Sequence, residues 1–432
     1  ILIGLVGSEM CIRDRYLIDE MLNIKEKGQV SGGIIELIVK NIAEVSYRVC
    51  AEMINNMTGL SISGVAVWNI VQQLGEEIKQ YEKEKVEAFQ EDKLKVGEKE
   101  TPTVYQEADG IMIYTQGNDR KEQIENYKKE HPNEEVPKKV RNIEIKLGMT
   151  YEGWKEIGKN RYELVGKEFV AGYMTGEEMA DITNANLHSK YDMNKVELRV
   201  LNSDGGSWIK KLLTAKAIYQ ADSYHLKEKI STHVRDKEDS EYLKTLFYKK
   251  EYSKMIEYVE ELKYKYDGEA QEIEKLHELQ KYLNKRKDTM KRYKDYEGVK
   301  QKLKTYSKKT GLKYRNMGCQ ESNNYCKLTR RMKKKRMSWS KNGSENIAKV
   351  ITFYASESCT DIIKDLSIQI LPESYIEYAQ RYIEEIEKNI KELKKNKVKT
   401  KEVYTFKQGT LEGYPNLKKI LENKAISELI YR

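Results

Sequence analysis

Three acidic residues stand where their side chains are suited to binding a metal ion: Asp109, Asp204 and Glu321. Asp109 begins an alternating run and shares its parity with Ile111 and Ile113, and Asp204 ends a later run that alternates in the same way. Both carboxylates are therefore expected on the apolar side of a strand. A carboxylate there is costly unless it has a partner, and a hard divalent cation is a suitable one.

Glu321 is expected to join the two aspartates from a helix. It shares a helical stripe with Tyr325, Leu328 and Met332, which predicts that it faces the sheet. A simpler interpretation is that an acid near a helix start complements the helix dipole. The aspartates also have simpler interpretations, because Asp-Gly pairs are typical of turns. The three acids together, at two strands and a late helix, favour a metal site.

The chemistry expected of such a site is in-line displacement at phosphorus. Two Mg²⁺ ions about 3.5–4 Å apart can activate the attacking oxygen and stabilise the leaving one, and Mn²⁺ can substitute. We expect Asp109 to bridge the ions, with Asp204 and Glu321 on either side. Water or a DNA 3′-hydroxyl would attack, which agrees with the absence of a G-x-S-x-G motif or a P-loop from the sequence.

The elements that must position these acids lie in residues 101–225. Period-two runs predict strands, and longer amphipathic runs predict helices. The expected strands are EADGIMIY (107–114), RNIEIKLGMTYEGW (141–154), RYELVGKEFVAGYM (161–174), KVELRVLNSD (195–204) and IYQADSYH (218–225), and the expected helices are GEEMADITNANLHSKYDM (176–193) and WIKKLLTAKA (208–217). Three strands, helix, strand, helix, strand is the order of the RNase H-like fold, so we expect a mixed α/β sheet with helices on its faces.

Helices are expected on both sides of this core. Residues 16–100 read as a helical N-terminal domain in which Gly59 caps one helix and LSIS opens the next, and Glu91–Pro102 reads as a linker. Helix, turn, helix is compatible with a helix-turn-helix DNA reader and also with any helical hairpin. Residues 226–310 predict an all-helical insertion, and residues 311–350 the final core helix with Glu321 and a basic run.

Both ends of the chain are expected to lie outside the core. Residues 351–432 read as a helical tail, with one helix opening at Pro372 and running to about Lys394. Residues 1–15 contain SEMCIRDR, which resembles a translated sequencing adapter, so we interpret them as an artefact and the authentic N-terminus as missing.

Charge is concentrated in one part of the chain. The net charge is +9, yet residues 285–341 alone hold 21 Lys and Arg against 4 Asp and Glu. Such a basic segment on an otherwise mildly acidic protein is the footprint of a polyanion-binding surface. An AT-rich genome also enriches lysine, but it would have spread the charge evenly. Nucleic acid is therefore the expected partner.

Composition also excludes some classes of protein. No apolar run reaches the roughly 18 residues that a membrane span needs, so no membrane partner is expected. Five cysteines form no C-x-x-C pair, which indicates a reducing, cytoplasmic location without disulfides or structural zinc.

The densest cations follow Glu321 on the same expected helix: Arg330, Arg331, Lys333, Lys334, Lys335 and Arg336. Their phosphate contacts would position DNA without reading its sequence. Trp339, just after them, is suited to stacking on an unpaired base and equally to anchoring the core.

The sequence resembles the ISLre family of insertion-sequence transposases, long catalogued as an uncharacterised bacterial protein family and related to Mutator-like transposases with a helical insertion before the last acid. The resemblance covers most of residues 50–350, with five motifs in order: EADGIMIY, the strand pair ending in GMTYEGW, SDGGSWIK, QADSYHLKEKI and MGCQESNNYCKLTRRMKKKRMSWSKNGSENIAK. It implies that Asp109, Asp204 and Glu321 are a DDE triad. Asp222 and His225 match a family signature, which suggests an auxiliary catalytic role for His225; a structural, hydrogen-bonded histidine is the alternative.

The expected function is thus Mg²⁺-dependent cleavage and strand transfer at the ends of an insertion sequence. The alternatives are a non-catalytic DNA-binding remnant of a transposase and an RNase H-like nuclease. Cut-and-paste transposition brings two DNA ends together, so we expect at least a homodimer on double-stranded DNA.

Overall fold

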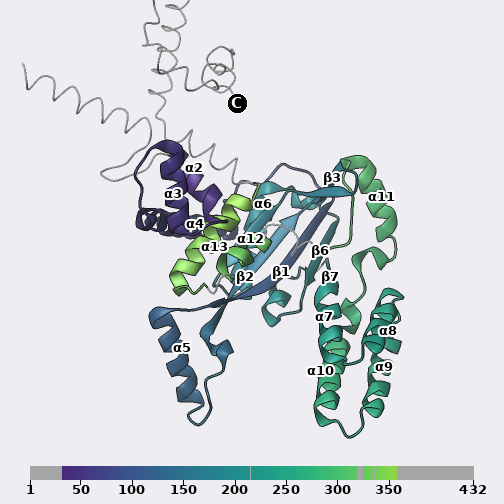
Figure 1. Cartoon of the computed structure of the whole chain (residues 1–432). Coiled ribbons are helices and arrows are strands. Elements are labelled where there is room, and N and C mark those ends of the chain that lie inside the picture. The colour runs from purple at the N-terminus through teal and green to yellow at the C-terminus, as the bar shows by residue number, and fades with distance from the viewer. Residues whose placement is uncertain (1–31, 215, 319–324, 334–336, 358–432) are drawn as a thin grey trace, which may run out of the picture. The chain divides into compact units, whose positions relative to one another are not determined.

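The computed structural model describes residues 32–214, 216–318, 325–333 and 337–357. At its centre is a five-stranded mixed sheet in the order β5-β2-β1-β6-β7 (Figure 1). β1, β2 and β5 are antiparallel neighbours, and β6 and β7 run parallel to β1. The strands are β1 (Thr103–Tyr114), β2 (Asn142–Tyr151), β5 (Glu168–Gly172), β6 (Leu198–Ser203) and β7 (Ala217–Ala221). The expected mixed α/β class is confirmed.

Two of the predicted strands each break into two. The chain leaves β2 for a separate hairpin of β3 (Gly153–Gly158) and β4 (Arg161–Val165), and only then enters β5. Asn160 turns the hairpin at φ 58° and Gly166 ends it at φ 74°. A Cβ at Gly166 would lie 2.3 Å from Glu152 Oε1, so this close turn requires glycine.

The predicted helix over 208–217 is instead a short 3₁₀ helix, η3 (Ser207–Leu212). It follows the Asp-Gly-Gly turn and ends at Leu212, which leaves little chain before β7 begins. Together with α6 (Gly176–Lys190), η3 covers one face of the sheet. The apolar side chains that join them to the strands are Ala108, Val170, Met179, Leu201, Ile209 and Leu212.

The opposite face of the sheet joins the largest core, which the N-terminal and C-terminal helices share with the strands. These helices are α2 (Gly32–Ile42), α3 (Tyr47–Thr58), α4 (Gly64–Gln90), α12 (Tyr325–Met332) and α13 (Lys341–Ala355). The predicted caps are confirmed: Gly59 ends α3 at φ 71°, and the Ser63 hydroxyl accepts from the amide of Ala66 at the start of α4. α13 packs on both α4 and β5.

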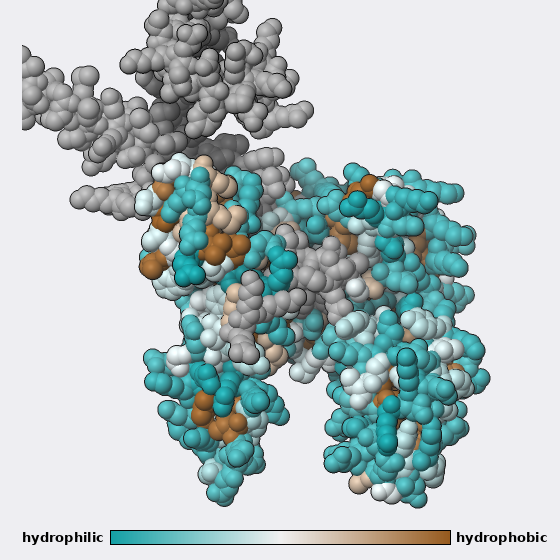
Figure 2. Space-filling model, viewed as in Figure 1, coloured by the Kyte–Doolittle hydropathy of each residue, from teal (hydrophilic) through white to brown (hydrophobic). Residues whose placement is uncertain are grey.

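The predicted helical insertion has its own core. Its helices are α7 (Ser223–His233), α8 (Lys237–Tyr248), α9 (Tyr252–Lys265), α10 (Ala270–Arg286) and α11 (Val299–Thr310), linked by the 3₁₀ turns η4 (Lys287–Thr289) and η5 (Tyr293–Asp295). Leucines at helical spacing, such as Leu276, Leu279 and Leu283 on α10, form a second apolar cluster with α7, α8 and α9. In the view of Figure 2 the outer surface of these helices is mostly hydrophilic.

One helix was not anticipated. α5 (Gly117–Glu130), followed by the short η1 (Lys138–Arg141), connects β1 to β2 and buries none of its residues. No helix of the described ranges is long and apolar enough to cross a membrane. The helix expected at Pro372 and the segment 1–15 lie outside the described residues.

Candidate active site

Three aspartates lie at one level of the three parallel strands, inside β1 and directly after the ends of β6 and β7. The register pairs Ala108 of β1 with Ser203 of β6, and Ser203 with Ala221 of β7. The next residue of each strand is an aspartate, and side chains at one level of adjacent parallel strands point to the same face. We call these residues, Asp109, Asp204 and Asp222, the acid row.

A second row of polar residues lies one step behind the acid row on the same face. Glu107, Asn202 and Gln220 are register partners and are buried, at 0%, 1% and 6% exposure. The amide of Gln220 donates to Asn202 Oδ1 at 2.9 Å, and Asn202 Nδ2 donates to Asp222 Oδ2 at 3.0 Å. Glu107 Oε1 accepts from the Tyr151 hydroxyl at 2.7 Å. We call this group the buried polar row.

Asp222 has a structural role. It is buried, and its second oxygen caps α7 by accepting from the amide of Tyr224 at 2.7 Å. With both oxygens hydrogen-bonded, Asp222 holds the first turn of α7 against the sheet. Its role in the acid row is therefore to place His225, which lies on that turn.

His225 stands between two carboxylates. Its Nε2 lies 3.8 Å from Asp109 Oδ2, and its Nδ1 lies 3.6 Å from Glu228 Oε2, with the imidazole 30% exposed. The auxiliary catalytic role suggested for His225 stays a prediction, and its place beside Asp109 is compatible with that role. A half-buried imidazole at this distance can orient an acidic ligand or move a proton near it.

The carboxylates of Asp109 and Asp204 each accept a hydrogen bond from a nearby backbone amide. Asp109 Oδ1 accepts from the amide of Gly110 at 2.7 Å, and Asp204 Oδ1 accepts from the amide of Gly206 at 3.0 Å. These bonds fix both carboxylates as partly exposed oxygen donors, the ligand type that Mg²⁺ prefers. The two residues thus fit part of a metal site.

Asp204 and His225 also line one cavity of about 260 Å³, which we call the His225 cavity. Its far wall comes from the insertion, where Tyr282 and Arg286 of α10 reach the sheet. Arg286 donates to the backbone oxygen of Asp204, and a Cβ at Gly205 (φ 90°) would lie 2.6 Å from its guanidinium. The Asp-Gly-Gly sequence therefore allows α10 to dock directly on the acid row.

The third predicted ligand, Glu321, lies outside the described residues. Within the described ranges no three His, Cys, Asp or Glu residues form a group that could hold a metal ion. The helical stripe predicted with Glu321 is confirmed at Leu328 and Met332, which are 1% and 0% exposed in the core against the sheet. Earlier in the chain, the amide of Gly318 donates to Glu107 Oε1 at 3.4 Å.

The predicted DNA-binding cations differ in their surroundings. Arg330 and Lys333 are exposed, and Arg330 forms an ion pair with Glu44. Arg331 is instead buried, at 4% exposure, and donates to the backbone oxygen of Ile42 at 2.8 Å. Its position is closed to phosphate, so the expectation that Arg331 contacts DNA is wrong. Lys334, Lys335 and Arg336 lie outside the described residues.

Trp339 is a core residue. It is 9% exposed, its indole N–H donates to the Met332 oxygen at 3.0 Å, and its backbone bridges to Thr115 beyond β1. The Arg331 guanidinium lies 4.9 Å from the Trp339 ring centroid. Of the two interpretations of Trp339, the core anchor is confirmed, and stacking on a base is excluded by burial.

Sequence reasoning missed several residues of this site: Glu107, Asn202, Gln220 and Arg286. A signal existed for the first three, because each stands two positions before a member of the acid row and so shares its face. Arg286 had no local signal, since it reaches Asp204 from 82 residues further along the chain.

The fold and site together define a mixed α/β protein with a row of acids across three parallel strands, at the level where β6 and β7 end. Residues 12–361 match the model of an uncharacterised protein family, UPF0236. The match spans most of the chain, so the protein belongs to this family. No curated protein matches the sequence.

Proposed function

We propose that this protein is a DNA transposase of a bacterial insertion sequence, with an RNase H-like catalytic core. The observation that carries the proposal is the placement of Asp109, Asp204 and His225 close together where β6 and β7 end beside β1. Three antiparallel strands followed by two parallel ones, with a helical insertion after the last, is the element order expected for such a core. The resemblance to ISLre transposases over the same residues supports the assignment.

In this proposal Asp109 and Asp204 hold divalent metal together with Glu321. Bound Mg²⁺ supplies Lewis acidity for in-line displacement at phosphorus, with Mn²⁺ as a substitute. Asp109 and Asp204 contribute carboxylate oxygens that the amides of Gly110 and Gly206 orient. His225 holds Asp109 in place and is within reach to accept a proton near the scissile phosphate.

The proposed DNA surface surrounds this site. The exposed cations Arg330 of α12 and Lys333 directly after it, together with the cations of residues 285–315, would neutralise phosphates of the bound DNA. These contacts position the duplex and carry no base specificity. A dimer on DNA would bring the two element ends together.

Cleavage of DNA tests the proposed site. Purified protein is incubated with Mg²⁺ and a labelled duplex from the end of the element, alongside Asp204→Asn. The matched control is Asp267→Asn, the same change at an exposed aspartate in the loop between α9 and α10. We expect Asp204→Asn to lower cleavage about 100-fold or more, because metal stabilisation is worth several kcal/mol, while the control cleaves normally. Equal cleavage by the two variants would contradict the assigned site.

A further inference from the structure

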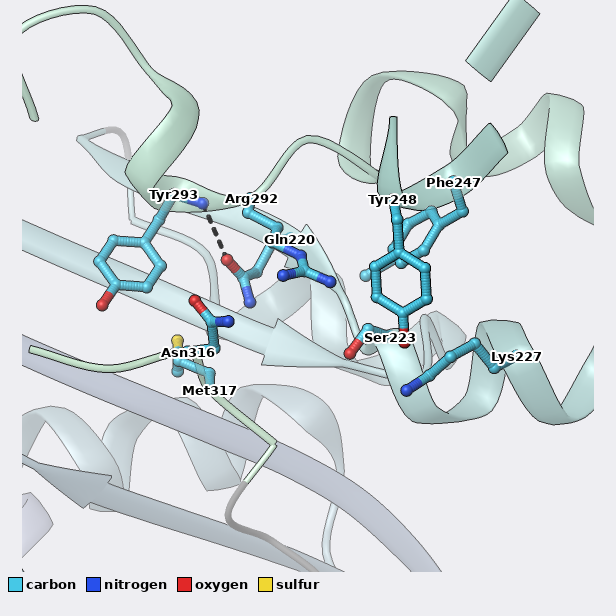
Figure 3. Close-up of a pocket in the computed structure, with 10 residues that line it drawn as sticks. Gln220, Ser223, Lys227, Phe247, Tyr248, Arg292, Tyr293, Asn316 and Met317 are labelled. Carbon is cyan, nitrogen blue, oxygen red and sulfur yellow. Dashed lines mark hydrogen bonds between the residues drawn. The ribbon is translucent and has the colours of Figure 1, made fainter. Parts of the chain in front are cut away.

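Two adjoining cavities lie between the buried polar row and the insertion. The first, of about 230 Å³, we call the Arg292 cavity. It starts at Gln220 of β7 and Ser223 of α7 and extends to Tyr248 and Arg292 of the insertion. Figure 3 shows the ends of Ser223, Lys227 and Tyr248 converging at one side of it, with the Arg292 guanidinium between them and Gln220.

The second cavity, of about 450 Å³, we call the Arg315 cavity. It shares Asn316 and Met317 with the first and adds Trp154, Lys294 and Arg315. The shared residues lead directly to Gly318, whose amide bonds to Glu107 of the buried polar row. Both cavities are therefore next to the proposed catalytic site.

Four cations surround these cavities: Lys227, Arg292, Lys294 and Arg315. Among the described residues none of the four forms an ion pair with a carboxylate, although ion pairs are common elsewhere in the insertion. The acid next in sequence to Lys294, Asp295, is already engaged by Lys250 at 2.6 Å. The cavities thus carry an excess of positive charge.

The cations are close enough to repel one another. Burial, and then the charges of Arg315 and Arg292, lower the pKa of Lys294. Clustering like charges in a half-buried place is unfavourable unless an anion neutralises them. This cost indicates that the cluster serves a ligand.

Aromatic rings hold the cations in place without neutralising them. The Arg315 guanidinium lies 3.9 Å from the centroid of the Tyr162 ring, and Arg292 lies 5.5 Å and 5.8 Å from those of Phe247 and Tyr248. Cation–π contacts fix the direction of a side chain and leave its N–H groups for hydrogen bonding. The arrangement is a preformed anion site.

We infer that the Arg292 and Arg315 cavities together bind the phosphate backbone of the DNA strand next to the scissile phosphate. The inference rests on the proposed function for its ligand. Two adjoining cavities with spaced cations suit a chain of phosphates better than one small anion, and arginine suits phosphate because its planar fork donates to two oxygens. The surrounding asparagine and serine add neutral donors for the same backbone.

Binding measured without catalysis tests this inference independently of the proposed function. The probe is a labelled duplex of arbitrary sequence, and its affinity is measured against salt concentration without Mg²⁺. The test variant is Arg292→Gln with Arg315→Gln. The control is Lys128→Gln with Lys129→Gln, which removes the same charge from exposed positions on α5. A charge-preserving variant, Arg292→Lys with Arg315→Lys, serves as a check on folding.

Each phosphate contact contributes about 0.9 to the log–log salt slope. We expect the glutamine pair to lower the slope by about 1.8 and the other two variants to leave it within about 0.3 of the original. Equal slopes for the glutamine pair and the α5 control would overturn the inference, even if Mg²⁺-dependent cleavage is observed. A reduced slope in a protein that never cleaves DNA would support the phosphate site and count against the transposase.

Discussion

At the scale of single residues, the acid row separates two roles for aspartate. Asp222 is buried and both of its carboxylate oxygens accept hydrogen bonds, whereas Asp109 and Asp204 are partly exposed and each accepts a bond from a backbone amide. A partly exposed carboxylate suits a metal ligand better than a buried carboxylate that caps a helix. This difference predicts which aspartates tolerate exchange for another ligand.

Replacing Asp204 by cysteine tests ligation. A thiolate is a poor ligand for Mg²⁺ and a better one for softer ions, so Asp204→Cys is expected to lose cleavage in Mg²⁺ and to recover at least about tenfold in Mn²⁺. The same change at Asp267 should leave cleavage unaffected in both metals. The assignment of Asp204 as a ligand fails if Mn²⁺ stimulates Asp204→Cys no more than it stimulates the unaltered protein.

The buried polar row predicts a loss of stability. Asn202→Leu fills the same space but leaves Gln220 Nε2 and Asp222 Oδ2 buried without their present partner. Each such group costs about 1–3 kcal/mol, so the free energy of unfolding should fall by at least about 2 kcal/mol. Urea unfolding measures it, with the exposed Asn284→Leu as control. If Asn202→Leu and the unaltered protein unfold at the same urea concentration, the hydrogen bonds of Asn202 contribute no net stability.

At the scale of elements, local signals were reliable and distant contacts were not. The caps at Gly59 and Ser63 follow from neighbouring residues, and the sequence predicts them correctly. The split of one expected strand into β4 and β5 depends on how Gly166 packs against Glu152, which no local pattern encodes. The same holds for α13, whose place on α4 and β5 is set by tertiary contacts.

The contact between α4 and α13 predicts the effect of one methyl group. A Cβ at Gly75 would lie 2.4 Å from the Cβ of Asn346, so Gly75→Ala must push the two helices apart. We expect about 1–3 kcal/mol of destabilisation, measured by urea unfolding. Gly33→Ala on α2 is the control, because nothing lies within 4 Å there and alanine favours a helix. Destabilisation of the same size in both variants would refute the close packing.

Lys85 on α4 predicts how stability depends on pH. Burial lowers its pKa to about 8, although Glu168 and Glu82 oppose this shift. The unfolded chain, with a lysine pKa of about 10.4, then binds more protons between these values, so the free energy of unfolding rises with pH there. Lys85→Met should lack that rise, while Lys83→Met, an exposed control, keeps it. Urea unfolding midpoints at several pH values distinguish the two variants. Identical pH profiles for Lys85→Met and Lys83→Met would contradict the lowered pKa of Lys85.

At the scale of the whole molecule, the sequence predicted the faces of the strands better than the use of charge. The alternating runs correctly place Asp109 on the face of Ile111 and Ile113 and Asp204 on the face of Val200, because strand parity is a local property. The charge pattern predicts one DNA surface for the basic run after Glu321, but Arg331 is buried in the core and bonds to the backbone of Ile42. A charge count cannot separate exposed cations from buried ones, since burial depends on the fold.

Joining of DNA strands is the activity proposed for the site of Asp109 and Asp204. The most direct measurement incubates the protein and Mg²⁺ with a labelled element end bearing a free 3′-hydroxyl and an unlabelled target plasmid. We predict covalent transfer of the label to the plasmid, abolished by Asp109→Asn and kept by Asp267→Asn. Cleavage without joining would favour a nuclease, and DNA binding with neither would favour a non-catalytic remnant; either result would contradict the transposase.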